Sequence, residues 1–168
     1  DQTFTYLSNG DDVFAITDSG ATASSYTIID IIGEMGDDPG SGWDVAGTTN
    51  GTQNHTLVRK STVTSGNTDW SASAGTTADN SEWIVLDQNT WDYVGSHPHT
   101  ELEANDPALF ISEYAEGSSN NKYLEIYNGT GADVDLSNYS LSSCSNGCDE
   151  DNEWDYPNNV TFAAGTII

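Results

Sequence analysis

Apolar and polar residues alternate along this chain over short stretches, and clusters of turn-forming residues separate those stretches. The stretches include residues 13–17 (VFAIT), 27–33 (TIIDIIG) and 55–60 (HTLVRK). Alternation with a period of two is typical of β-strands. No stretch keeps an apolar period of 3.6 residues over three turns, as an amphipathic helix would. Many short strands separated by turn residues predict an all-β sandwich.

The strand predicted at residues 27–33 has the clearest pair of faces. Ile28 and Ile32 share one face with Asp30, whereas Ile29 and Ile31 lie on the other. An Asn9-Gly10 turn precedes the strand at 13–17, because this dipeptide favours positive φ.

The region between residues 67 and 87 is expected to hold irregular loops between short strands, anchored by Trp70 and Trp83. Two further strands are expected in "ALFISEY" and "KYLEIYN". In residues 132–143, Val134 and Leu136 alternate with Asp133 and Asp135, which predicts a strand with its apolar side facing inward.

Residues 95–107 (GSHPHTELEANDP) differ in amino-acid composition from the rest of the chain. They hold two of the four prolines and a single large apolar residue, Leu102, so they are expected to form a linker. This divides the chain into residues 1–94, the linker 95–107 and residues 108–168. His97 and His99 could form a metal-binding pair, but Pro98 lies between them and we assign them to the linker.

Charge narrows the classes of partner. The 168 residues contain 27 acidic and three basic side chains, Arg59, Lys60 and Lys122, for a net charge of −24. Such a surface repels nucleic acid and anionic lipid, and no apolar run is long enough to insert into a membrane. Solvated carboxylates suit a protein that is secreted into salty water, and Ca²⁺ is the natural small partner.

Two acidic stretches are candidate Ca²⁺ sites. The first is the turn with Asp37, Asp38 and Asp44 around "PGSG", which alone offers too few oxygen ligands. The second contains Asp149, Asp151, Glu153 and Asp155, spaced like the start of an EF-hand loop. Trp154 and Val160 replace the glycine and glutamate that an EF-hand needs, so only a looser site remains.

Covalent modification is suggested at two kinds of residue. Cys144 and Cys148 could form a local disulfide or pair with cysteines of other chains, either of which suits an extracellular protein. Five Asn-x-Ser/Thr sequons are candidate glycosylation sites, at Asn50, Asn54, Asn128, Asn138 and Asn159.

Catalytic motifs are missing. The chain lacks serine-nucleophile motifs, phosphate-binding glycine loops and Cys–His pairs, and it is predicted not to be an enzyme. Glu113 and Glu116 resemble paired glycosidase carboxylates only as any acid-rich chain would. The five tryptophans and eight tyrosines are expected to pack in the core, although exposed ones in a row would form a sugar-binding platform.

The stretch "LFISEYAEGSSNNKYLEIYNGTGADVDLSNYSL" resembles the start of lamin-tail domains, in the version found in secreted bacterial proteins. Within the first 95 residues, "NGDDVFAI", "HTLVRK" and "NTDWSASAG" resemble how these domains finish. The resemblance implies an immunoglobulin-like β-sandwich without catalytic residues, used as an accessory or repeated module. Here the family's C-terminal half precedes its N-terminal half.

This order suggests a circular permutation, an out-of-phase slice of a tandem array, or a subunit completed by its neighbours. We therefore expect a non-catalytic extracellular module that assembles head-to-tail with other copies by β-strand complementation. The apolar residues expected to contribute at the two chain ends are Phe4, Tyr6, Phe162, Ile167 and Ile168. The alternative is a Ca²⁺-dependent module that binds glycans or a cell surface for a larger secreted enzyme.

Overall fold

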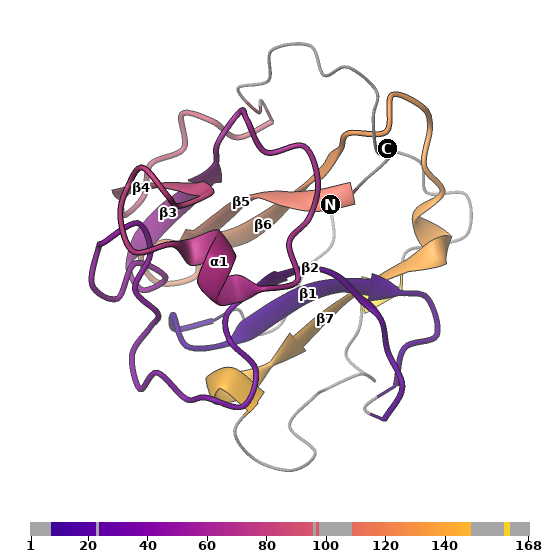
Figure 1. Ribbon diagram of the computed structural model, residues 1–168, viewed down its shortest axis with the longest axis horizontal. Helices are drawn as coiled ribbons and strands as arrows, with labels where there is room; N and C mark the ends of the chain where they lie inside the picture. Colours follow the sequence, from indigo (N-terminus) through magenta and orange to yellow (C-terminus); the bar gives the residue numbers. More distant parts are fainter. Residues whose placement is uncertain (1–7, 23, 96, 98–108, 149–159, 162–168) are drawn as a thin grey trace.

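The computed structural model of the chain describes residues 8–22, 24–95, 97, 109–148 and 160–161. These residues form an antiparallel β-sandwich of two four-stranded sheets (Figure 1). The β1 sheet has the strand order β2-β1-β7-β8, and the β5 sheet has the order β4-β3-β5-β6. The predicted immunoglobulin-like, all-β sandwich is thereby confirmed.

The β1 sheet contains four strands: β1 (Val13–Asp18), β2 (Ile28–Ile32), β7 (Tyr139–Cys144) and β8 (Val160–Thr161). The β5 sheet contains β3 (His55–Arg59), β4 (Trp83–Asp87), β5 (Leu109–Glu116) and β6 (Lys122–Asn128). Strands were predicted over most of these stretches, but β8 was not predicted and β7 begins later than expected.

The expected strand at 132–143 is wrong in its first half. Leu136–Asn138 form a 3₁₀ turn, η1, and the strand starts only at Tyr139. The Asp135 side chain accepts a hydrogen bond from the backbone N–H of Ser137, which caps this turn. The predicted facing still holds, because Leu136 is buried while Asp133 and Asp135 are exposed.

A short helix that the sequence pattern did not indicate, α1 (Trp70–Ala74), precedes β4. The Asp69 side chain caps its N-terminus by accepting from the backbone N–H of Ala72. At one turn and a half, the helix is too short to show a 3.6-residue period. It lies in front of the two sheets, between β3 and β1 in the view of Figure 1.

The core lies between the sheets and is dominated by aliphatic strand residues and three tryptophans. Trp43, Trp70 and Trp83 are all buried. The ring centroids of Trp43 and Trp70 lie 6.5 Å apart, and those of Trp70 and Trp83 lie 6.4 Å apart. Aromatic pairs at this spacing add to the burial of apolar area. These three rings therefore belong to the core and not to a sugar-binding platform.

Candidate functional site

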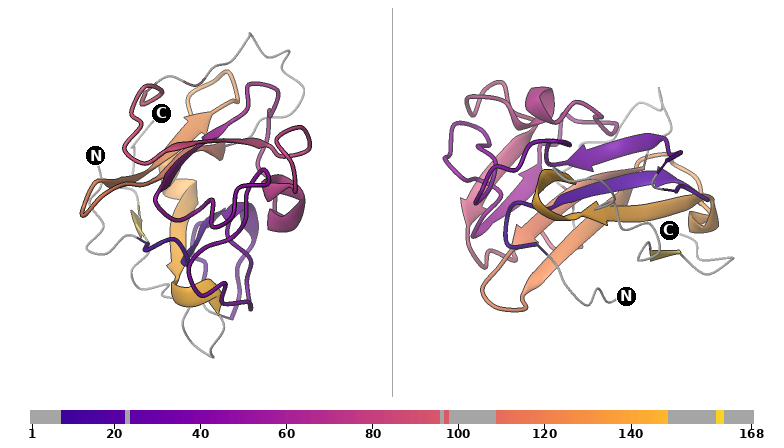
Figure 2. Two further views of the ribbon diagram at one scale, coloured as in Figure 1. Left: turned by 90° about the vertical axis from the view of Figure 1, so that its left-hand side faces the viewer. Right: turned by 90° about the horizontal axis from the view of Figure 1, so that it is seen from below.

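Both sheets are joined down the middle by strands from opposite ends of the chain. We call the described residues 8–97 the leading segment and residues 109–161 the trailing segment. In the β1 sheet, β1 pairs with β7 from Val13↔Cys144 to Asp18↔Tyr139. In the β5 sheet, β3 pairs with β5 from Thr56↔Ala115 to Val58↔Glu113. Figure 2 shows the two segments side by side, with β7 in orange next to β1 in indigo.

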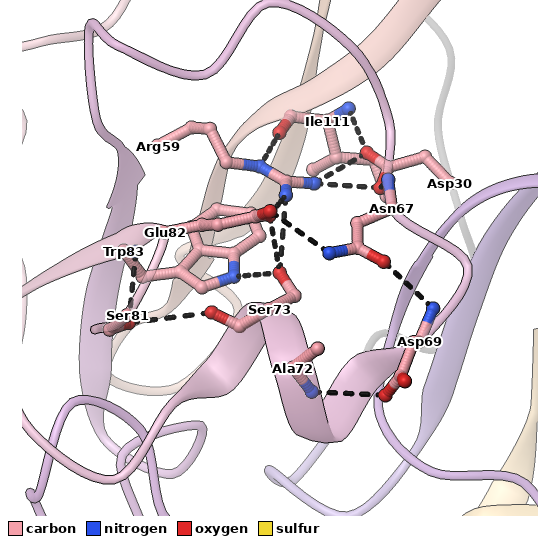
Figure 3. Close-up of polar contacts among 10 residues, drawn as sticks. All are labelled: Asp30, Arg59, Asn67, Asp69, Ala72, Ser73, Ser81, Glu82, Trp83 and Ile111. Carbon is pink, nitrogen blue, oxygen red and sulfur yellow. Dashed lines mark hydrogen bonds and ion pairs between the residues drawn. The ribbon is translucent and has the colours of Figure 1, made fainter.

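A buried ion-pair network crosses the same joint (Figure 3). Arg59 on β3 is completely buried, and its Nη2 donates to both carboxylate oxygens of Asp30 on β2 at 2.7 Å. Its Nε donates to the carbonyl oxygen of Ile111 on β5 at 3.2 Å. In return, the Ile111 backbone N–H donates to Asp30 Oδ2 at 2.7 Å. One arginine and one aspartate thus connect both sheets and both segments.

Further polar groups of the leading segment complete the network. Arg59 Nη1 donates to Glu82 and to Ser73 Oγ, and the guanidinium carbon lies 4.1 Å from the ring centroid of Trp83. Ser73 Oγ donates to Glu82 Oε2 at 2.9 Å and accepts from Trp83 Nε1 at 2.9 Å. The network leaves no buried charge without a partner, which is the condition under which buried ion pairs are tolerated.

The protonation of Asp30 reflects two opposing effects. Burial raises the pKa of its carboxyl, whereas the Arg59 guanidinium and the backbone N–H groups of Asn67 and Ile111 act against that rise. Both Asp30 and Arg59 have no exposed side-chain surface. The Asp30–Arg59 pair therefore cannot meet a ligand from solvent, and through the backbone of Ile111 it connects the two segments.

A second buried carboxyl lies on the opposite side of the β5 sheet. The register of β5 shifts between Ile111 and Glu113 relative to β6, and this β-bulge turns both Ser112 and Glu113 toward the outer face. Glu113 is 1% exposed and is paired in register with Glu125. Burial raises the pKa of Glu113, the Tyr123 hydroxyl opposes the rise, and Glu125 adds to it.

The two carboxyls that suggested a glycosidase pair do not form one. Glu113 faces outward, whereas the Glu116 carboxylate accepts from the backbone N–H of Asn54 and pairs with Lys122. Strand alternation places the two side chains on opposite faces of the sheet.

The acidic turn lies at one end of the sandwich. Asp38 Oδ1 accepts from the backbone N–H of Gly40, and both Asp37 and Asp38 are exposed. Among the residues that the structure describes, no three His, Cys, Asp or Glu side chains are placed to share a metal ion. The other candidate ligands, Asp149, Asp151 and Glu153, lie outside the described residues.

This end also holds a buried aspartate that sequence reasoning missed. The carboxylate of Asp11 is buried, and its Oδ2 accepts from the Asn9 side chain at 2.9 Å. Burial raises its pKa, and the Asp38 and Glu116 carboxylates contribute to the rise.

Gly147, in the 3₁₀ turn η2 (Ser145–Cys148), fits closely against the backbone of Asp37.

Cys144 and Cys148 form a disulfide in the structure, with their Cα atoms 5.4 Å apart. The bond ties the end of β7 to η2, which donates from the Gly147 N–H to the carbonyl of Asp11. The local pairing, one of the two alternatives that the sequence left open, is the one present here.

Four of the five candidate glycosylation sites lie in the part of the chain that the structure describes, whereas the candidate assembly residues do not. The asparagines at 50, 54, 128 and 138 are described, and Asn54 and Asn138 are exposed. Outside the described residues lie Asn159 and the five candidate assembly residues, Phe4, Tyr6, Phe162, Ile167 and Ile168. Most of the predicted linker, residues 95–107, lies there too.

One open cavity of about 340 Å³ lies beside α1. It is lined by Ile31, Met35 and Trp70, together with the acidic residues Glu34 and Asp69. Both acids already accept hydrogen bonds from nearby groups, since Asp69 caps α1 and Glu34 accepts from Ser71 Oγ. No helix in the described part of the chain is long and apolar enough to cross a lipid bilayer.

The sequence did contain a signal for the buried network. Asp30 stands in "IIDII", where a carboxylate inside an apolar strand needs a buried partner. Only three bases are available in the whole chain, and Arg59 lies at the end of another apolar strand. Serine and glutamate partners such as Ser73 and Glu82 carry no comparable signal.

The fold and the buried joint define an immunoglobulin-like β-sandwich module. Comparison with known families is consistent with this class, since the model of the Lamin Tail Domain family matches residues 103–168. The match supports the lamin tail domain family for the trailing part of the chain, where the sequence resemblance was strongest. The resemblance of residues 1–95 to the end of such a domain, and hence the permuted order, stays a prediction. No curated protein and no solved structure matches the chain.

Proposed function

We propose that this chain is a non-catalytic, extracellular structural module that assembles head-to-tail by exchanging its two segments between copies. The trailing segment of one copy would pair with the leading segment of the next, forming a tandem array or a filament. Lamin tail domains are non-enzymatic immunoglobulin-like modules, which supports the non-catalytic part of the proposal.

One observation carries the proposal: both sheets depend on strands from both segments. The β1–β7 and β3–β5 pairs, together with the Arg59 network, hold the two segments together. A trailing segment from a neighbour would satisfy the same hydrogen bonds and bury the same surface. Exchange therefore costs little beyond the entropy of association, as in domain swapping.

The geometry of exchange determines the product. If two copies exchange reciprocally, the assembly closes as a dimer. If each copy gives its trailing segment to a different neighbour, the contact is heterologous and propagates without closing.

Charge and cysteine chemistry support an extracellular setting for this proposal. A disulfide between Cys144 and Cys148 persists in oxidising compartments. The net charge of −24 opposes close approach of copies at low salt, so assembly should strengthen as ionic strength rises. The alternative is a Ca²⁺-dependent adhesion module. Among the described residues, no three metal-ligating side chains come together to support it.

A pair of engineered cysteines across the joint tests the proposal. Asp18 and Tyr139 are paired in register at the end of the β1–β7 ladder, one in each segment. In the variant Asp18→Cys/Tyr139→Cys, oxidation joins neighbours into a ladder of covalent multimers if segments are exchanged. It closes within one chain if they are not, and a non-reducing gel separates these results.

A matched control uses a pair that lies within one segment. His55 and Asp87 are paired in register between β3 and β4, both in the leading segment. His55→Cys/Asp87→Cys must close within one chain in either arrangement. Covalent multimers from the Asp18/Tyr139 pair alone support segment exchange. Monomers from both pairs, at high protein concentration and salt, would overturn it.

A further inference from the structure

The outer face of the β5 sheet is buried although it faces away from the core. Val58, Phe110 and Ala115 point outward by strand alternation, yet each is at most 1% exposed. Glu113 lies among them and is equally buried. A sheet face of this kind needs a cover, and part of that cover is the chain that follows β4.

This cover is a loop of residues 90–95 together with His97, which we call the crossing loop. The Trp91 ring lies 5.6 Å from the ring of Tyr123. The Gly95 backbone N–H donates to Glu125 Oε2 at 2.6 Å. His97 packs edge-on against Phe110 and Tyr127, with ring centroids 5.8 and 5.6 Å away. The crossing loop belongs to the leading segment, whereas these four partners all lie on β5 or β6 of the trailing segment.

On this face lies the buried carboxyl of Glu113, which none of the lysines and arginines neutralises. Arg59 is held in the interior by Asp30, Lys60 donates to the carbonyl of Ala78, and Lys122 pairs with Glu116. These are all the lysines and arginines in the sequence. Glu125, opposite Glu113, already accepts from Ser112 Oγ and the Gly95 N–H. A proton is therefore the simplest way to neutralise Glu113.

We propose that the crossing loop is a proton-controlled latch that seats on the β5–β6 outer face of either its own chain or a second copy. With Glu113 protonated, the face is neutral at its centre and the loop stays seated. With Glu113 ionised, a buried charge stands opposite Glu125, and lifting the loop is the movement that lets water reach it. The intermolecular part of this inference rests on the proposed segment exchange.

The tyrosines and carboxyls near the latch cannot supply a compensating positive charge. Tyr123 and Glu125 on β6 are the groups that face Glu113 electrostatically. Tyr123 stays protonated at all physiological pH values, because its burial raises its pKa further. Asp92 and Tyr93 on the crossing loop can add only negative charge, and His97 packs against Phe110 and Tyr127.

The proton dependence can be measured on the full chain through one amide. Gly95 N–H is protected by Glu125 only while the loop is seated, so its hydrogen-exchange protection factor reports opening. Between the pKa of Glu113 in the open and seated states, protection should fall about tenfold per pH unit, since one proton is released. Glu113→Gln should abolish this slope, whereas Asp92→Asn, a charge change on the loop itself, should preserve it. An unchanged slope in Glu113→Gln would overturn proton control.

Seating on a second copy is tested by mixing two single-cysteine variants. Trp91→Cys and Tyr123→Cys each lack a partner within their own chain, so a mixed disulfide between them forms only if the loop of one copy reaches the face of another. Asp44→Cys, at an exposed site, mixed with Tyr123→Cys sets the background of random collision.

The outcomes separate this inference from the proposed function. A mixed Trp91/Tyr123 product above background supports seating between copies. Its absence, when the Asp18/Tyr139 pair still gives a covalent ladder, overturns seating between copies and leaves segment exchange standing. If neither product forms, segment exchange itself fails, and seating between copies fails with it.

Discussion

Asp30 and Glu113 are both buried carboxyls, yet one lies between the sheets and the other on the outer face of the β5 sheet. Asp30 accepts hydrogen bonds from Arg59 and from the backbone of Asn67 and Ile111. Glu113 has a tyrosine hydroxyl and a second glutamate as its polar neighbours. The buried base Arg59 thus neutralises Asp30 in the interior, whereas the outer carboxyl of Glu113 can be neutralised by binding a proton.

The difference shows what each carboxyl can do. A paired, fully hydrogen-bonded ion pair holds one geometry and resists change over a wide pH range. A buried carboxyl without a base responds to pH, because its ionisation destabilises the group that covers it. The interior network therefore specifies how the segments fit, and the outer carboxyl sets how firmly the crossing loop holds.

Breaking the interior pair should have the largest effect. Arg59→Leu leaves Asp30 buried without its counter-ion, and we expect a loss of about 3–5 kcal/mol in the free energy of unfolding. Urea denaturation measures the loss, with Lys60→Leu as the control at the neighbouring base, where a change within about 0.5 kcal/mol is expected. Equal losses in the two variants would mean that the ion pair does not specify the fold.

Removing the hydroxyl that links the network should have an intermediate effect. Ser73→Ala deprives Arg59, Glu82 and Trp83 of a common partner, and we expect a loss of about 1–3 kcal/mol. Ser71→Ala, on the exposed side of the same helix, should cost less than about 0.5 kcal/mol. Thermal unfolding of both variants tests the contrast, and a matching decrease in melting temperature would argue against it.

Replacing the outer carboxyl, Glu113, should have the smallest effect on the free energy of unfolding. This change should be a gain, whereas the other two substitutions cause losses. Folding raises the pKa of Glu113, so the folded chain binds more protons than the unfolded chain above pH 4.5, the ordinary value. Stability should consequently fall as pH rises through the interval up to the folded pKa. At pH 8, Glu113→Gln should gain on the order of 1 kcal/mol.

The pH profile of unfolding checks this sign directly. The profile of Glu113→Gln should be flatter than that of the wild type, while retaining the part contributed by Asp11, whose pKa is also raised. A loss of stability at pH 8 would show that Glu113 is held as a carboxylate by partners that the geometry does not reveal.

Much of the fold could be predicted from local pattern. The strands at 28–32, 55–59 and 109–116 follow from alternation and β-branched residues, and Asp30 was placed on the same face as Ile28 and Ile32. Two errors in predicted secondary structure lie where an aspartate side chain accepts a hydrogen bond from the backbone. Asp135 caps a 3₁₀ turn inside an alternating stretch, and Asp69 caps a helix of five residues. Such short-range hydrogen bonds override a periodicity that only a few residues carry.

The sequence by itself determined the strand pattern, the acidic surface and the scarcity of bases, because these depend on local propensity and on composition. Only the tertiary structure decided that strands from the two segments pair in both sheets, that Arg59 meets Asp30 and Ile111, and that Glu113 faces outward. The physical reason is that pairing depends on contacts between residues far apart in the chain. The facing of Glu113 further depends on a single bulge, since one extra residue in a strand reverses which side chains point to the core.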